Sequence, residues 1–153
     1  MRGEQYLMTH NSNDSSTREV SVGFLVQNLA QKFDARMKLK LGKIDVDIKL
    51  FPGLMMLKGE DGINQRSFGE KLDFPQYFSS RNIDALVKAG FVERRPDPNS
   101  RRATLIFLTT NGKAKAKLLP AIVKQVNDEA LADLEPSQRA ELVSLLRIAN
   151  ATV

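Results

Sequence analysis

Four arginines surround a short turn in the stretch RRPDPNSRR, residues 94–102. A guanidinium group is always charged, and its planar fork donates paired hydrogen bonds to a carboxylate or a phosphate. Asp97 is the only acidic residue inside the turn, so the arginines have no obvious carboxylate partners there. We expect their side chains to bind an external polyanion, the alternative being a solvated charged loop. The four residues are Arg94, Arg95, Arg101 and Arg102.

The residues around this turn favour a β-hairpin. Residues 91–95 and 103–109 are β-biased, and a Pro-Asp-Pro-Asn-Ser sequence separates them. Two short helices are expected just before the hairpin, at 64–72 and 75–90, because Asp73-Phe74-Pro75 breaks the chain between them. A helix-turn-helix followed by a hairpin is a winged helix-turn-helix.

Composition is consistent with a polyanion partner and excludes several classes of site. The chain has 153 residues, a formal net charge of +5 and a pI of about 9.6. It has no cysteine, and its only histidine is His10, so neither thiol chemistry nor a histidine metal site is expected. No nucleophile–base pair and no glycine-rich phosphate loop is found. We therefore expect no enzyme, no metal and no cofactor. The absence of a secretory signal or an apolar span favours the cytoplasm.

The second short helix carries further candidate binding residues. Its inward side chains are expected to be Ile83, Leu86 and Val87. With Ile83 inward, the 100° step per residue places Tyr77, Phe78 and Arg81 on the opposite face. For the two aromatic residues, the alternative is packing. Gly90 is expected to end the helix.

These exposed side chains suit DNA. Arg81 can pair with a guanine edge or clamp a phosphate, and Tyr77 can contact a thymine methyl group or a phosphate. Gln76 and Ser80 suit phosphates or base edges. Asp84 lies three residues after Arg81, so it either orients that arginine or forms an ordinary surface pair.

Longer amphipathic helices flank this unit. The first is expected over 17–41, with Ser16 and Glu19 as a capping box and Gly42 as its end. Its apolar face consists of Val22, Val26, Leu29, Phe33 and Met37. Another is expected over 47–58, capped by Asp47, where Pro52-Gly53 delays its start or kinks it.

Two more helices are expected at the C-terminal end. The helix from 110 to 131 carries a stripe of Ala114, Leu118, Ile122, Val126 and Ala130, with a bend at Pro120. The helix at 135–150 is expected to bury Leu142, Leu145, Leu146 and Ala149. One small core cannot cover all these apolar stripes, so we expect a two-fold homodimer. The fold class is thus mainly α with a small β-hairpin wing.

The stretch SRNIDALVKAGFVERRPDPNSRRATLIFLTTNGKA, residues 80–114, resembles the MarR family of bacterial and archaeal winged-helix transcription regulators. The matching motifs are Ser80-Arg81, Asp84, Leu86, Gly90-Phe91-Val92-Glu93-Arg94 and Leu108-Thr109-Thr110-Asn111-Gly112. Order and spacing agree from about 17 to 150. The polar residues 1–16 are expected to form a flexible N-terminal arm. The resemblance implies dimerisation helices at 17–46 and 110–150, and a winged helix-turn-helix at 47–109.

The chain departs from the family pattern in four places. Ser100 stands where an acid usually braces the wing arginine, here Arg102. Ser79 stands where an aliphatic core residue is usual, so Phe78 is a candidate to fill that space. Phe68-Gly69 replaces a common Leu-Ala, and Pro52-Gly53 is unusual inside the second helix.

The resemblance implies a homodimeric repressor that binds a pseudo-palindromic operator in double-stranded DNA at the nucleoid. Arg101 and Arg102 would enter a narrow minor groove, whereas Arg94 and Arg95 would serve the fold or the backbone phosphates. A small aromatic or phenolic effector would release the DNA. Its expected site is Phe33, Arg36, Met37, Phe51, Leu54 and Met55, for which core packing is the alternative. The alternative function is a winged helix that docks protein without binding specific DNA.

Overall fold

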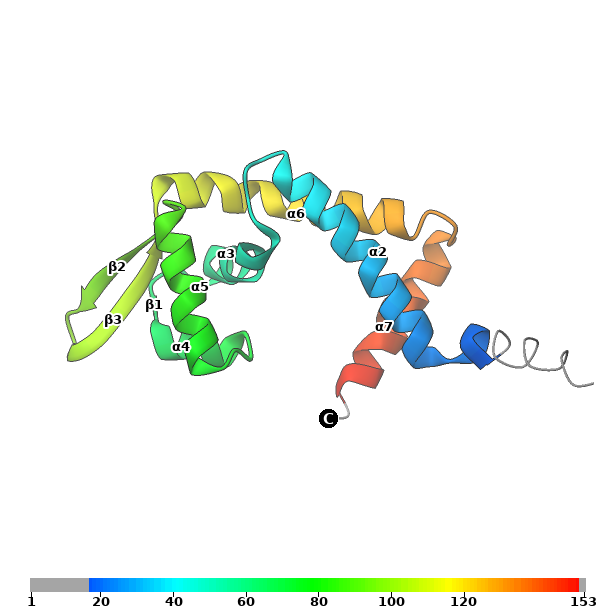
Figure 1. The fold of residues 1–153 in the computed structure, drawn as a ribbon, viewed down its shortest axis with the longest axis horizontal. Coiled ribbons are helices and arrows are strands. Elements are labelled where there is room, and N and C mark those ends of the chain that lie inside the picture. The colour runs from blue at the N-terminus through cyan, green and yellow to red at the C-terminus, as the bar shows by residue number, and fades with distance from the viewer. Residues whose placement is uncertain (1–16, 152–153) are drawn as a thin grey trace, which may run out of the picture.

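The structure is a computed structural model that describes residues 17–151. The predicted arm, with His10 and the cap residue Ser16, lies outside the described residues. The elements in chain order are α2 (Val22–Gly42), the 3₁₀ turn η1 (Ile48–Leu50), α3 (Phe51–Gly59), β1 (Ile63–Asn64), α4 (Gln65–Lys71), α5 (Gln76–Lys88), β2 (Val92–Asp97), β3 (Ser100–Leu108), α6 (Thr110–Ala130) and α7 (Pro136–Ala151). Figure 1 shows α3, α4 and α5 gathered beside the β2–β3 wing. The predicted winged helix-turn-helix and the mainly helical class are confirmed.

Helix starts follow local capping. A helical turn at 17–20 is interrupted at Ser21, whose extended backbone starts α2 afresh and whose Oγ accepts a hydrogen bond from Phe24 N at 3.4 Å. The prediction of one helix from residue 17 is therefore wrong. Asp47 caps η1 by accepting from Lys49 N at 2.8 Å, and α3 begins at Phe51 with Pro52 in its first turn. That delayed start is one of the two expected outcomes.

The wing is a three-stranded antiparallel sheet in the order β1–β3–β2. The hairpin was expected, but its strands extend further toward the tip than predicted. β1 joins β3 because Gly62 turns the chain with a φ of +78° and donates from its N–H to the carbonyl of Ile106 at 2.9 Å. Asp61 continues the edge, since its Oδ1 accepts from Leu108 N at 2.7 Å. The base of the wing is thereby tied to the body.

One hydrophobic core joins the helices to the sheet. Its fully buried large side chains are Phe68, Leu41, Leu54, Leu57, Ile83, Leu86, Ile106, Leu119 and Val126. The inward placement of Ile83 and Leu86 is confirmed, but Val87 remains 38% exposed. Val87 lies one 100° step beyond Leu86, which rotates it out of the core.

The apolar stripe of α6 differs from the predicted one in its first half. Ala114 and Leu118 are exposed, whereas Ala116 and Leu119 are buried. Each four-residue step advances about 40° beyond a full turn, so an unbroken series of such steps leaves the face. The real stripe therefore mixes three- and four-residue steps down to Ile122, Val126 and Ala130, where prediction and structure agree.

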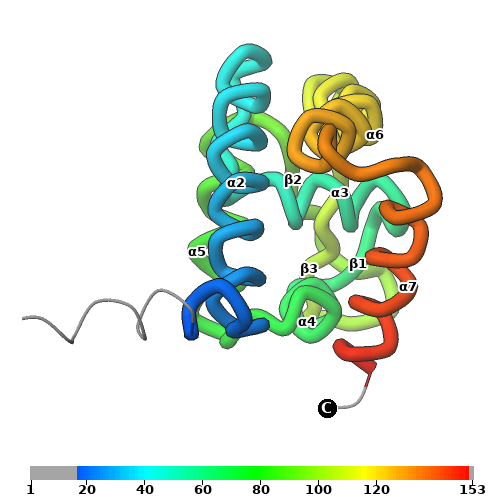
Figure 2. The backbone as a smooth tube through the Cα atoms, turned by 90° about the vertical axis from the view of Figure 1, so that its right-hand side faces the viewer, coloured from blue at the N-terminus to red at the C-terminus, as the bar shows by residue number. Residues whose placement is uncertain are grey.

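The last helix is the largest correction. None of α7 is buried in the single chain, and Leu145 and Ile148 are 56% and 65% exposed. Figures 1 and 2 show α7 and the N-terminal part of α2 at the end of α6 away from the wing. Arg139 holds α7 there by donating to Asp128 Oδ1 at 3.3 Å and to the carbonyl of Leu134 at 3.0 Å. The hydrogen bond from Lys124 lowers the pKa of the Asp128 carboxyl below its usual range.

The unusual small residues of the helix-turn-helix pack against each other. A Cβ on Gly69 would lie 2.4 Å from Ser79 Oγ, so α4 and α5 touch at these two positions. Ser79 is buried and donates from its hydroxyl to the carbonyl of Pro75 at 3.2 Å. Close approach thus replaces the aliphatic residue, and the idea that Phe78 fills the space is wrong, because Phe78 is 39% exposed.

Among residues 17–151, no helix combines the length and the apolar character that a membrane span requires.

Gly112→Ala is expected to destabilise the fold by about 3 kcal/mol, the upper end of the usual cost of overpacking. A Cβ there would lie 1.9 Å from the carbonyl oxygen of Phe91, and backbone cannot move aside as a side chain can. The matched control is Gly42→Ala, where a Cβ meets nothing within 4 Å and helix propensity improves by less than about 1 kcal/mol. Urea denaturation measures both, and equal midpoints would contradict this packing.

Candidate nucleic-acid interface

The exposed face of α5 is the one predicted. Gln76, Tyr77 and Arg81 are exposed on it, and Tyr77 shows 67% of its surface. The Phe78 ring meets Phe74 edge-on at 4.7 Å between centroids, so it packs on one side and faces solvent on the other. Ser80 is only half-buried and stays reachable at the edge of this face.

Three arginines are free to bind an external anion. Arg81, Arg101 and Arg102 are exposed, and none makes an ion pair or side-chain hydrogen bond with any of residues 17–151. Asp97 forms no ion pair with either tip arginine among residues 17–151; its Oδ1 accepts from Asn99 N at 2.8 Å and closes the turn, and its one charge is outnumbered by the two arginines. Positive charge therefore remains at the wing tip and on α5.

The other two arginines have partners inside the protein. Arg94 donates to Asp84 Oδ1 at 2.5 Å, and Arg95 pairs with Glu93 while its guanidinium lies 4.3 Å above the Phe107 ring. The expectation that these two lack acidic partners is thus wrong. Asp84 is engaged by Arg94 across the α5–β2 junction, so it does not orient Arg81. The Arg94–Asp84 pair depends on β2 lying beside α5, whereas Glu93 is two residues before Arg95 in the same strand.

A groove of about 880 Å³ runs between the helix-turn-helix and the wing. It brings together Gln76 from α5, Arg102 from β3, and Gln65 and Arg66 from α4. Sequence reasoning missed the last two, although the first turn of the first short helix already placed them beside the turn. Arg66 donates to Glu70 at 2.8 Å, and this hydrogen bond raises the pKa of the Arg66 guanidinium above its usual value. The groove wall therefore carries two guanidinium groups, those of Arg66 and Arg102, and one carboxylate, that of Glu70.

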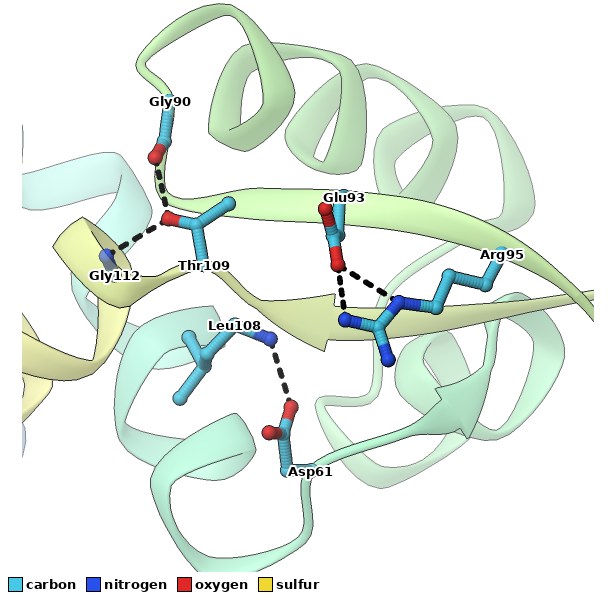
Figure 3. Close-up of polar contacts among 7 residues, drawn as sticks. All are labelled: Asp61, Gly90, Glu93, Arg95, Leu108, Thr109 and Gly112. Carbon is cyan, nitrogen blue, oxygen red and sulfur yellow. Dashed lines mark hydrogen bonds and ion pairs between the residues drawn. The ribbon is translucent and has the colours of Figure 1, made fainter.

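The base of the wing is locked by hydrogen bonds that Figure 3 shows. Thr109 Oγ1 donates to the carbonyl of Gly90 at 2.6 Å and accepts from Gly112 N at 3.0 Å. One hydroxyl thereby joins the end of α5, the end of β3 and the start of α6. The Arg95–Glu93 pair lies on β2, an edge strand of this sheet. The exposed side chains of α5 and of the wing are consequently carried by elements that are hydrogen-bonded to one another.

Known proteins with similar sequences and structures share this winged-helix arrangement. A family model described as the MarR family matches residues 53–103. The multiple antibiotic resistance protein MarR of Escherichia coli is 28% identical over 137 residues, covering 89% of this chain and 95% of that protein. A MarR transcriptional regulator from Methanosarcina mazei has a similar structure, with a TM-score of 0.76, 28% identity, and coverage of 85% of this chain and 94% of the other.

In sequence and in fold the chain is similar to the MarR family. It has the winged-helix DNA-binding fold of MarR-family transcriptional regulators. A mutant E. coli MarR complexed with operator DNA matches it with a TM-score of 0.78 at 27% identity, over 87% of this chain and 96% of that one. The relatives named above are transcriptional regulators, and such regulators are not enzymes.

The predicted MarR effector residues lie against the core. Leu54 is fully buried, and Phe33, Met37, Phe51 and Met55 are partly buried and pack on the core. Arg36 is half-buried and donates to the carbonyl of Lys32 at 3.3 Å. For Leu54, core packing is what the structure shows. Within residues 17–151, no cluster of three or more acidic or histidine side chains could hold a metal ion.

Thr109→Val is expected to lower the free energy of unfolding by about 1–2 kcal/mol, the cost of losing a helix cap. The change keeps the shape of the side chain but removes the hydrogen bonds to Gly90 and Gly112. Thr110→Val, one residue later and without a cap role, is the control. Chemical denaturation of both variants measures the change. A Thr109→Val midpoint equal to that of the control would show that the Thr109 hydrogen bonds do not stabilise this junction.

Proposed function

We propose that this chain binds a specific double-stranded DNA operator as a homodimer, with α5 in the major groove and the wing against the neighbouring minor groove. The observation that carries the proposal is a set of three arginines on α5 and the wing that have no partner in the described part of the chain, beside a groove that both elements line. An arginine without a carboxylate inside the protein gains most from an external phosphate or base. The E. coli MarR complexed with operator DNA supports it by likeness.

The proposed roles follow from position. The N-terminal half of α5 presents Gln76, Tyr77, Ser80 and Arg81, and in such motifs that end of the helix contacts base edges. Arg81 is assigned to a base edge because its guanidinium has no competing partner among residues 17–151. At the wing, Arg101 and Arg102 are assigned to the minor groove or its phosphates. Arg94 and Arg95 are assigned to holding the wing.

The dimer is proposed from the exposed apolar surface at the other end of the molecule. Exposed side chains there are Val22, Phe24, Leu25 and Val26 on α2, and Val143, Leu145, Leu146 and Ile148 on α7. Several large apolar side chains exposed at one end of a molecule are typical of an interaction site. The two-fold pairing of residues 17–46 and 110–150 would cover it and leave residues 47–109 free for DNA. Repression and release by an aromatic effector remain predictions from the family resemblance.

Arg81→Ala is expected to lose about 1–3 kcal/mol on the operator and to relax base preference, because a bidentate base contact is removed. Arg102→Ala is expected to weaken binding to operator and scrambled duplexes alike. The slope of log affinity against log salt should fall by about 0.9 for each phosphate that the protein no longer neutralises. The control is Lys38→Ala, which removes one positive charge from an exposed position of α2, outside the proposed DNA contacts.

The measurement is a salt titration of the three variants on both duplexes. Unchanged affinity and slope for Arg102→Ala would show that the wing arginines are merely solvated. A wild-type chain that binds no duplex specifically would favour the protein-docking alternative instead.

Leu145→Glu is expected to convert a dimer into a monomer, because it places a charge in the proposed apolar interface. The wild-type chain should sediment at about twice its 17.1 kDa. Ser144→Glu, which adds the same charge at an exposed polar position of α7, is the control. Analytical ultracentrifugation distinguishes the outcomes, and a monomeric wild type that binds its operator fully would overturn the dimer.

A further inference from the structure

A buried asparagine on α5 is not explained by the interface. Asn82 is only 5% exposed and lies on the side of α5 opposite the candidate DNA face. Its Nδ2 donates to the carbonyl of Lys49 in η1 at 2.9 Å, whereas its Oδ1 has no hydrogen-bond partner among residues 17–151. A buried amide that satisfies only one of its polar atoms is unfavourable compared with an apolar side chain of like shape.

The surroundings of Asn82 are built closely around it. A Cβ on Gly53 would lie 3.3 Å from Asn82 Oδ1 and 2.9 Å from Phe68 Cζ, so the glycine that looks out of place in α3 makes room for both. The backbone of α3 therefore approaches α5 directly beside the asparagine. This tight packing holds the side-chain amide in one orientation, aimed at the Lys49 carbonyl.

The hydrogen bond to Lys49 ends a segment that begins at the dimerisation helix. Residues 43–50, here called the strap, connect α2 to α3 and bury Val46 and Leu50. At its other end, Lys115 of α6 donates to the carbonyl of Ile44 at 2.5 Å. The strap is thus held by a side chain from α6 at one end and by a side chain from α5 at the other.

We propose that Asn82 is a positioning residue for operator recognition: through Lys49 and the strap, it sets the orientation of α5 relative to the dimerisation helices. This inference rests on the proposed DNA function. A dimer reads two half-sites only when its two recognition helices are held at the right separation and angle. A directional hydrogen bond specifies such an orientation, whereas apolar contacts tolerate small rotations.

The central variant is Asn82→Leu, which keeps a similar volume and removes both amide groups. Its melting temperature is expected to stay close to that of the wild type, because removal of the unsatisfied Oδ1 offsets the loss of the hydrogen bond to the Lys49 carbonyl. Its preference for a wild-type-selected operator over a scrambled duplex is expected to fall about tenfold, within the range for one base that is no longer read correctly. Affinity for the scrambled duplex should change less than about twofold, because phosphate contacts remain.

Two matched comparisons separate positioning from stability. Ile83→Val removes a buried methyl group from the same helix, so it is expected to lower the melting temperature and keep the operator preference. Lys115→Met releases the other end of the strap and is expected to reduce the preference as Asn82→Leu does. Lys117→Met, which removes the same charge from an exposed position of α6, should not.

A readout without DNA keeps this inference separate from the proposed function. Backbone amides of residues 43–50 are expected to exchange hydrogen faster in free Asn82→Leu than in the wild type, without a loss of global stability. A wild-type chain that selects no duplex would sink the DNA function, while exchange would still report on the strap. Unchanged exchange and unchanged operator preference in Asn82→Leu would overturn the positioning role.

Discussion

The arrangement depends on the junction where α5, the wing and α6 meet at Thr109. Its hydroxyl serves Gly90 and Gly112 together, and its backbone N–H donates to the carbonyl of Phe91 at 3.0 Å. Because Gly112 touches the Phe91 backbone, nothing larger fits between α6 and the chain that enters the wing. The end of α5, the wing and the start of α6 are therefore joined at one closely packed junction.

The arginines of the wing differ in whether they have partners inside the protein. Arg94 pairs with Asp84, which joins β2 to α5. Arg95 pairs with Glu93 and lies over the Phe107 ring, which joins β2 to β3. The same contacts leave the arginines farther along the wing unpaired. A charge that stays unpaired on a stiff support loses little conformational entropy when it meets a phosphate, which favours binding. The four arginines around the turn therefore fall into two pairs, one that holds the wing and one that is available to an external anion.

Local patterns in the sequence were sufficient to predict several of the helices and which of their side chains are exposed. The exposed face of α5 followed from the position of Ile83 and a fixed helical step, and the late start of α3 followed from the missing N–H of Pro52. Contacts between distant segments were not accessible in the same way. Asp84 was expected to meet Arg81 on its own helix, but β2 brings Arg94 closer. The exposure of Leu145 likewise depends on what covers α7, which a single chain cannot decide.

The central claim is that this chain recognises DNA sequence through a symmetric pair of α5 helices. Binding-site selection from a pool of random duplexes, using the purified wild-type protein at physiological salt, tests it most directly. The account predicts enrichment of a pseudo-palindrome whose half-sites lie about one helical turn, ~10 base pairs, apart. Recovery of unrelated sequences with no inverted repeat, at an affinity that depends only on salt, would contradict it.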